Sequence, residues 1–252
     1  MTHRSPPAGY VRITAGQSTV VVRDDLAGDA RALLAEGNLY EAAARDLAAR
    51  TLQGRGTAYA IALPVSGLRV VVRRNRHGGL LAPLTQDFFL PPTRAPHELA
   101  TSLRLGAAGV RTPAVVMYGV DRAYVALRRA DIVTQEIVGS SDLATYMQSA
   151  VAAGLRTTAW AAAVALVHTL NAAGARHHDL NVKNILLVPH GGNFEAWVLD
   201  VDRVVFGTPN SAKVRLGNAA RLLRSARKWR DERGAVFDEG DAAQLGVSSL
   251  YL

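Results

Sequence analysis

The sequence predicts an α+β protein with two lobes, an antiparallel-sheet lobe with one helix at residues 1–138 and a mostly helical lobe at 139–252. Two observations support this fold class. Short β-rich runs dominate the first half of the chain, and Ala- and Leu-rich helical runs dominate the second. A polar stretch, HHDLNVKNILL at 177–187, interrupts the helical half. Within the first lobe, residues 1–50 form an extension whose role the sequence does not reveal.

The predicted sheet lobe begins with two strands and continues with a hairpin and a helix. Residues 10–23 alternate like two strands around a glycine turn, and residues 26–50 are typical of one helix or a broken pair. Runs at 57–63 and 68–74 are joined by the turn PVSG and preceded by QGRGT, which predicts a hairpin behind a glycine loop. A helix is expected at 94–109, which opens after a proline and closes with a glycine.

The character of the chain changes near residue 139. Short strands are expected before it, at 114–118, 123–127 and 131–138. Helices are expected after it, at 141–152, 157–173 and 210–233. Between the last two helices, the polar stretch runs into apolar residues, the turn PHGGN and the strand EAWVLD, which predicts a second hairpin.

The composition indicates a globular protein whose surface attracts anions. Hydrophobic residues make up 49% of the 252 residues, and the formal net charge is +8. A basic surface favours anionic partners such as nucleotides or acidic lipid headgroups. Only three of the 29 basic residues are lysines, which is consistent with forked recognition of phosphate, although GC-rich codon usage is the preferred explanation.

Several classes of protein are excluded by what the sequence lacks. The absence of cysteine rules out a disulfide framework, thiolate catalysis and cysteine-ligated metal, and it favours the cytosol. No stretch reaches the roughly 18 consecutive apolar residues that span a bilayer, and the first residues show no apolar signal region. We therefore expect a soluble or peripheral protein.

The polar stretch has the spacing of a kinase catalytic loop, H-x-D-x-x-x-x-N, with His177, Asp179 and Asn184. A loop of this length can direct a carboxylate at an acceptor hydroxyl while the Asn amide oxygen reaches a metal ion on the nucleotide phosphates. Asp200 follows the next apolar strand, where kinases place a metal-binding aspartate. Such hard oxygen ligands suit Mg²⁺. The alternative is that these residues shape a turn and end a strand, and both His177 and His178 are expected to brace the loop.

The segments around this loop resemble the Kdo kinase and lipopolysaccharide core kinase family, which has a protein-kinase-like fold. The resemblance covers roughly residues 50–230 and leaves the first 45 residues unmatched. Its segments are GRGT at 54–57, VVRRNRHGGLLAPL at 71–84, RAPHEL at 94–99, HHDLNVKNILL at 177–187, LDVDR at 199–203 and NAARLLRSARK at 218–228.

The resemblance implies ATP-dependent phosphorylation of the Kdo sugar on lipid A, with ATP and Mg²⁺ as cofactors. Asp179 is then the catalytic base, and Asn184 and Asp200 are the Mg²⁺ ligands. The implied nucleotide-binding set is Gly54, Arg55, Gly56, Thr57, Arg73, Glu98, Glu136 and Val138. The two glycines would let backbone N–H groups approach the phosphates, and the backbone near Glu136 to Val138 would bind adenine.

Arg73 departs from the protein-kinase pattern, because no lysine precedes Lys183 in this sequence. We expect Arg73 to pair with Glu98, and Arg74 to point to the opposite face of the strand. Asp202 replaces the glycine of the usual D-F-G motif. It is either a further metal or network carboxylate or a salt-bridge partner of Arg203 or the basic tail.

The implied partners are a lipid A-linked sugar or another glycan acceptor and an anionic membrane surface. Residues 203–233 contain nine Lys or Arg against two acids, and Arg221, Arg224 and Lys228 share one helix face while Leu222, Leu223 and Ala226 can pack inward. The resemblance favours a lipid-binding role for that face over a merely solvated one, at the cytoplasmic side of the inner membrane. No nucleic-acid partner is expected, because the sequence has no base-reading motif.

Two other functions remain open from the sequence. One is a soluble small-molecule kinase of the aminoglycoside or fructosamine type, whose Asp, Asn and Asp arrangement is similar. The other is a catalytically silent kinase-fold scaffold, which the missing lysine would allow.

Overall fold

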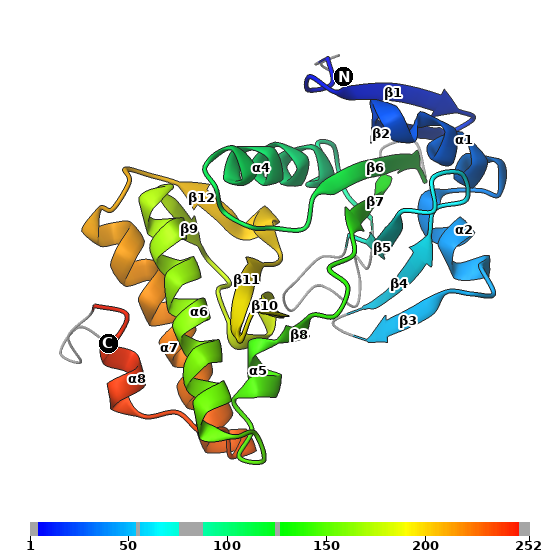
Figure 1. Cartoon of the computed structure of the whole chain (residues 1–252). Helices are drawn as coiled ribbons and strands as arrows, with labels where there is room; N and C mark the ends of the chain where they lie inside the picture. The colour runs from blue at the N-terminus through cyan, green and yellow to red at the C-terminus, as the bar shows by residue number, and fades with distance from the viewer. Residues whose placement is uncertain (1–4, 54–55, 76–87, 124–126, 247–252) are drawn as a thin grey trace. The chain divides into compact units, whose positions relative to one another are not determined.

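The computed structural model describes residues 5–53, 56–75, 88–123 and 127–246 (Figure 1). The chain divides into two compact units. Unit 1 contains residues 1–100 and 114–136, and unit 2 contains residues 101–113 and 137–252. The division falls inside one helix after residue 100, again after residue 113, and again after residue 136.

Unit 1 is built on a seven-stranded sheet in the order β1-β2-β6-β7-β5-β4-β3, in which all neighbours are antiparallel. The strands are β1 (Tyr10–Ala15), β2 (Ser18–Arg23), β3 (Arg50–Gln53), β4 (Thr57–Ala62), β5 (Arg69–Arg74), β6 (Val115–Arg122) and β7 (Arg128–Gln135). The predicted hairpin is confirmed, because β4 pairs with β5 and Ala58 lies opposite Arg73. The predicted glycine loop falls partly on residues 54 and 55, outside the described residues.

Helices cover both faces of this sheet. The helices α1 (Ala27–Ala35) and α2 (Leu39–Arg45), joined to β2 by the turn η1 (Asp24–Leu26), pack on one face. On the other face, Ala95 and Leu99 of α4 (Ala95–Ala107) pack against Ile132. Both faces of β2 are therefore buried, and its three consecutive valines point alternately into the two cores.

The N-terminal extension is part of the sheet unit. Hairpin β1–β2 adds two strands beside β6, and residues 26–50 form a broken pair of helices, one of the two expected alternatives. Asp29 of α1 is 1% exposed and accepts hydrogen bonds from the backbone N–H groups of Val65 (2.7 Å) and Ser66 (3.0 Å), so α1 holds the turn between β4 and β5. The expectation of one helix in the first lobe was therefore wrong for the described residues.

Two details of unit 1 differ from the expectations. Strand β3 was not predicted, because RTLQ is too short to show a clear alternation. Of the three short strands expected between 114 and 138, the first and the last fall on the longer strands β6 and β7, and the one expected at 123–127 lies largely outside the described residues. Strands β6 and β7 pair antiparallel, with Tyr118 opposite Ile132, so that apolar runs that are separate in the sequence lie side by side.

Unit 2 combines two small sheets with helices. One sheet has the order β11-β10-β8 and the other pairs β12 with β9. The strands are β8 (Ser141–Asp142), β9 (Ala175–His177), β10 (Ile185–His190), β11 (Asn193–Val198) and β12 (Val204–Phe206). The helices and helical turns are α5 (Leu143–Tyr146), α6 (Ala153–Ala172), η2 (Val182–Asn184), η3 (Val201–Arg203), α7 (Ala212–Arg233) and α8 (Glu239–Ala243).

The long helices α6 and α7 pack together in the core of unit 2 (Figure 1). Leu222, Leu223 and Ala226 of α7 are fully buried, as their helical spacing predicted. Gly174 ends α6 with φ +67°, and a Cβ there would lie 2.3 Å from the Gly207 carbonyl oxygen, so no larger residue fits this approach. The core therefore fixes α7 beside the polar stretch between β9 and β10.

Two of the three helices predicted for unit 2 are confirmed. Helices were expected at 157–173 and 210–233, and α6 and α7 confirm both. The helix expected at 141–152 is reduced to the single turn α5, and α8 was not predicted. Within the described residues, no helix combines the length and apolar character needed to cross a bilayer.

Candidate active site

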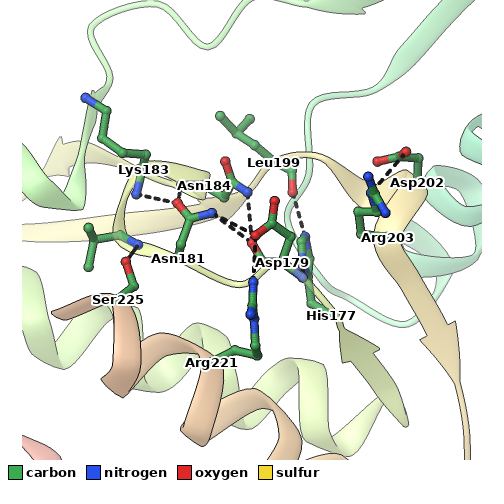
Figure 2. Close-up of polar contacts among 11 residues, drawn as sticks. His177, Asp179, Asn181, Lys183, Asn184, Leu199, Asp202, Arg203, Arg221 and Ser225 are labelled. Atoms are coloured by element: carbon green, nitrogen blue, oxygen red, sulfur yellow. Dashed lines mark hydrogen bonds and ion pairs between the residues drawn. The ribbon is translucent and has the colours of Figure 1, made fainter. Parts of the chain in front are cut away.

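The polar stretch forms a loop between β9 and β10 that Asn181 holds in shape (Figure 2). Asn181 Oδ1 accepts the backbone N–H groups of Lys183 (3.0 Å) and Asn184 (3.1 Å), which caps the helical turn η2. Asn181 Nδ2 donates to the Asp179 backbone oxygen at 3.0 Å. One asparagine thus fixes the backbone on both sides of the loop.

His177 links the loop to the strand that follows the hairpin. Its ring is fully buried, and its Nδ1 accepts the Asp179 backbone N–H at 3.1 Å. The proton therefore lies on Nε2, which donates to the Leu199 carbonyl oxygen at 2.8 Å (Figure 2). Burial lowers the pKa of His177, although the nearby carboxylates of Asp200, Asp179 and Asp202 oppose this shift. These contacts confirm the expected bracing role for His177, whereas the His178 side chain has no hydrogen bond with the described residues.

Asn184 and Asp200 lie at the same end of the hairpin β10–β11. Ile185 pairs with Val198, and the Asn184 carbonyl accepts the Leu199 N–H at 2.9 Å, so Asp200 follows one residue beyond this contact. Asn184 Nδ2 donates to the Asp179 backbone oxygen at 2.9 Å, which directs Oδ1 away from the loop (Figure 2).

The backbone at Asp200 is left-handed, with φ 54° and ψ 47°. Asp is one of the few residue types that visit this region, at a cost on the order of 1 kcal/mol. Its carboxylate makes no hydrogen bond or ion pair with any described residue. The protein therefore tolerates a strained backbone conformation at a carboxylate that has no partner among the described residues, a combination typical of functional sites.

The donor set of Asn184 and Asp200 fits Mg²⁺. An amide oxygen and a carboxylate at one end of a hairpin are hard ligands for an ion that keeps waters and binds phosphate oxygens as well. Across the described ranges, no group of three or more His, Asp or Glu is arranged to hold a metal ion by protein ligands alone. Phosphate and water would therefore have to complete the coordination.

The Asp179 carboxylate forms an ion pair with a residue of α7, Arg221, which the sequence did not predict. Arg221 Nη2 lies 2.8 Å from Asp179 Oδ1, and Asn181 Nδ2 lies 3.4 Å from the same oxygen (Figure 2). Arg221 was expected on a lipid-facing surface with Arg224 and Lys228; its guanidinium contacts Asp179, and the lipid-binding role of that face stays a prediction. The guanidinium turns to the loop because an anionic partner lies within its reach. Arg224 and Lys228 are exposed.

The aspartate after Asp200 has a local partner. Asp202 Oδ2 lies 3.8 Å from Arg203 Nε, one of the alternatives that the sequence left open (Figure 2). The side chain of Lys183 points away from the loop, and its Nζ lies 2.5 Å from Asp142 Oδ2.

Arg73 and Glu98 form the expected ion pair in unit 1. Arg73 Nη2 contacts Glu98 Oε1, and the Glu98 side chain is 3% exposed. Arg73 Nη1 also donates to Asn75 Oδ1 at 3.1 Å. Arg74, the next residue of β5, contacts Asp131 on the other side of the strand, as strand alternation predicted.

The remaining nucleotide-binding candidates are only partly described. Gly54 and Arg55 lie outside the described residues, whereas Thr57 begins β4 and its carbonyl accepts the Tyr40 hydroxyl at 3.2 Å. Gly56 immediately precedes that strand.

Glu136 and Val138 lie where the chain leaves β7. The Glu136 side chain pairs with Arg50 and, at 2.8 Å, with Arg69, and its N–H donates to the Arg69 carbonyl at 3.0 Å. Val138 is 61% exposed. The Glu136 carbonyl and the Val138 backbone groups have no backbone hydrogen-bond partner among the described residues.

The fold and the site together define a mixed α+β protein whose polar loop between β9 and β10 has the residue types of a phosphotransferase. The chain belongs to the lipopolysaccharide kinase (Kdo/WaaP) family, whose model matches residues 42–242. This confirms the family resemblance found in the sequence.

Named relatives are similar over most of their length. The chain is 30% identical over 200 residues to 3-deoxy-D-manno-octulosonic acid kinase of Actinobacillus succinogenes, covering 77% of this chain and 81% of the relative. It is 35% identical over 199 residues to the protein of the same name from Stenotrophomonas maltophilia strain K279a, covering 76% and 74%.

A solved structure shares the fold. WaaP in complex with acyl carrier protein aligns with a TM-score of 0.58 and 21% identity, covering 90% of this chain and 86% of that chain. The mixed α+β class expected from the sequence is therefore confirmed.

Proposed function

We propose that this protein is an ATP-dependent kinase that phosphorylates a hydroxyl group of the Kdo sugar linked to lipid A. Membership of the lipopolysaccharide kinase family and the names of its relatives support this activity. The observation that supports it most directly is that Asp179 and Asn184 of the loop in unit 2, and Asp200 after the following hairpin, occur in the order and spacing of a kinase catalytic site. The proposed fold is the bilobal protein-kinase type.

In this proposal Asp179 accepts the proton of the acceptor hydroxyl as that oxygen attacks the terminal phosphate of ATP. Asn184 and Asp200 hold Mg²⁺, which neutralises charge on the phosphate oxygens when it is bound. His177 keeps the loop backbone in place through Asp179 and Leu199.

The nucleotide ligands of unit 1 are assigned by the same proposal. Arg73, oriented by Glu98, contacts phosphate, because a guanidinium can hold a carboxylate and a phosphate with different N–H groups. The segment Gly54 to Thr57 contributes backbone N–H groups to the phosphates. The Glu136 carbonyl and the Val138 backbone bind adenine.

The acceptor side of the proposal uses three cations of α7. Arg224, Arg227 and Lys228 line a groove of about 370 Å³ with Ala220, Asp231 and Glu232. Each basic residue near an anionic lipid surface contributes about 1 kcal/mol of attraction. We propose that this face meets the lipid headgroups at the cytoplasmic side of the inner membrane.

An Asp179→Asn variant tests the proposed chemistry. Asparagine keeps the shape of the side chain but cannot take the proton, so kcat should fall by a factor of about 100 or more. The measurement is transfer of phosphate from ATP to Kdo–lipid A, followed by mass spectrometry of the lipid.

The control for this test is Arg31→Gln, a change at an exposed residue of α1 that has no hydrogen bond or ion pair with the described residues. Equal transfer by the parent and Asp179→Asn would defeat the enzymatic proposal. Transfer to an aminoglycoside or a fructosamine in place of Kdo–lipid A would keep the kinase and replace its acceptor.

A further inference from the structure

Helix α7 presents three polar side chains to the catalytic loop at helical spacings of three and four residues. Asn218 Oδ1 accepts the His177 backbone N–H at 2.8 Å, and Ser225 Oγ accepts the Val182 backbone N–H at 3.2 Å. Arg221, between them, contacts the Asp179 carboxylate at 2.8 Å (Figure 2). The stripe Asn218–Arg221–Ser225 therefore contacts the loop at its start, at its aspartate and at its helical turn.

The position of this stripe is fixed by the core. Asn218 is fully buried, and its Nδ2 donates to Asn171 Oδ1 (2.9 Å) and to the Ala175 carbonyl (2.8 Å). Leu222, next to Arg221, is also fully buried. Because these contacts leave α7 little freedom to rotate, the Arg221 guanidinium is delivered to one place beside the loop.

The contact with Arg221 restricts the carboxylate itself. The terminal torsion of an aspartate is broad, so an unrestrained carboxylate samples many orientations. Arg221 Nη2 and Asn181 Nδ2 both approach Oδ1, which selects one orientation of the carboxylate plane. The side chains of Arg221 and Asp179 are 38% and 19% exposed, so water screens this pair only in part.

We propose that Arg221 is a positioning residue for the catalytic base, and that the stripe on α7 sets the geometry of the catalytic loop. This inference rests on the proposed function, because it assigns Arg221 a role through Asp179. It separates Arg221 from Arg224, Arg227 and Lys228, which line the groove assigned to the acceptor side. Arg221 is not among the residues of that groove.

The test compares Arg221→Gln, Arg221→Lys and Arg221→Ala with the parent protein. A misplaced base slows the chemical step without weakening nucleotide binding, so Arg221→Gln should lower kcat about 10- to 100-fold and leave the Kd for ATP with Mg²⁺ within about twofold. Arg221→Lys should recover part of kcat because it restores the charge but not the fork. Added guanidinium should raise kcat of Arg221→Ala, and the Arg31→Gln control should match the parent.

A second readout does not depend on activity. Amide hydrogen exchange in residues 179–184 should become faster in Arg221→Gln and remain unchanged in β1 and β2. Unchanged kcat, or a loss of kcat that is matched by weaker ATP binding and is not recovered by lysine or guanidinium, would overturn the positioning role. If the parent protein itself transfers no phosphate to any acceptor, the proposed function fails, and unchanged exchange in the loop would then overturn this inference separately.

Discussion

His177 shows how a single buried residue can hold a polar loop in place through both of its ring nitrogens. It accepts one backbone N–H and donates to one backbone carbonyl, so both ring nitrogens are satisfied only in the neutral form with the proton on Nε2. A second proton on Nδ1 would remove the acceptor for the Asp179 N–H. The loop and the following strand are therefore joined by a group whose protonation breaks the link.

We predict that acidification destabilises the protein through His177. Its pKa is lowered by burial from an ordinary value of 6.5, so below that pH the unfolded chain binds more protons than the folded one. The contribution of neutral His177 is fully present above pH 6.5 and is lost as the pH falls towards the folded pKa. Urea unfolding of the parent and of His177→Gln, at about pH 7.5 and 5.5, measures this.

The free energy of unfolding of the parent should fall more between these two pH values than that of His177→Gln. The exposed His168 provides the control, and His168→Gln should behave like the parent. The same pH dependence in His177→Gln and the parent would show that His177 is not responsible.

At the scale of elements, helix α2 is attached to the sheet through a buried ion pair. Arg74 Nε lies 3.0 Å from Asp131 Oδ1, and the Tyr40 N–H donates to Asp131 Oδ2 at 3.1 Å. Arg74 also donates to Asn38 Oδ1 at 3.0 Å and lies over the Tyr40 ring at 4.4 Å. Arg74 therefore contacts both the N-cap residue of α2, Asn38, and its aromatic residue, Tyr40.

Burial and charge act in opposite directions on Asp131. Burial raises the pKa of Asp131 by more than the hydrogen bond and charge of Arg74 lower it, and the net pKa is about 6. Because the folded pKa is raised, the contribution of Asp131 to stability is fully present below pH 3.8 and is lost as the pH rises through about 6.

We predict that removing only one partner of this pair is costly. Asp131→Leu leaves the Arg74 guanidinium buried without its carboxylate and should lower the free energy of unfolding by about 3 kcal/mol. The double variant Arg74→Met/Asp131→Leu removes both charges and should be less destabilised than Asp131→Leu alone. Urea unfolding gives both values, and a cost below about 1 kcal/mol for the single variant would contradict the prediction.

The sequence predicted elements where local signals were complete. The hairpin β4–β5 had two β-rich runs and a turn signal, and α6 and α7 had long helical periods. Strand β3 and helix α8 have four and five residues, too few to show a period. Tertiary pairing alone decides such short elements.

The site was predictable in its residue types and less so in its contacts. The spacing of Asp179, Asn184 and Asp200 indicated the loop and its hairpin. The contact of Arg221 with Asp179 joins positions 42 apart in the chain, and helical spacing alone placed Arg221 with the surface cations. One sequence signal could have indicated this contact: Asn218, Arg221 and Ser225 are polar residues at helical spacings of three and four, next to the apolar Leu222.

At the scale of the whole molecule, the residues proposed to bind one nucleotide are distributed over both compact units. Arg73 and Glu98 belong to unit 1, whereas Asn184 and Asp200 belong to unit 2. A ligand that binds only the folded protein stabilises it by about 2.7 kcal/mol at 100 times its Kd. Changes in either unit should then reduce the same ligand-induced stabilisation.

We predict that ATP with Mg²⁺ raises the Tm of the parent by several degrees, and that Arg73→Ala and Asp200→Ala each remove most of this rise. Arg73→Ala should weaken the shift by ATP with and without Mg²⁺, because it loses a phosphate contact. Asp200→Ala should lose only the part that depends on Mg²⁺, because it loses a metal ligand. Thermal unfolding with ATP, with ATP and Mg²⁺, and with EDTA measures these shifts in Tm, and Arg31→Gln is the control. If Arg73→Ala keeps the full shift, the phosphates are not bound by unit 1, and the assignment of Arg73 in place of a lysine is wrong.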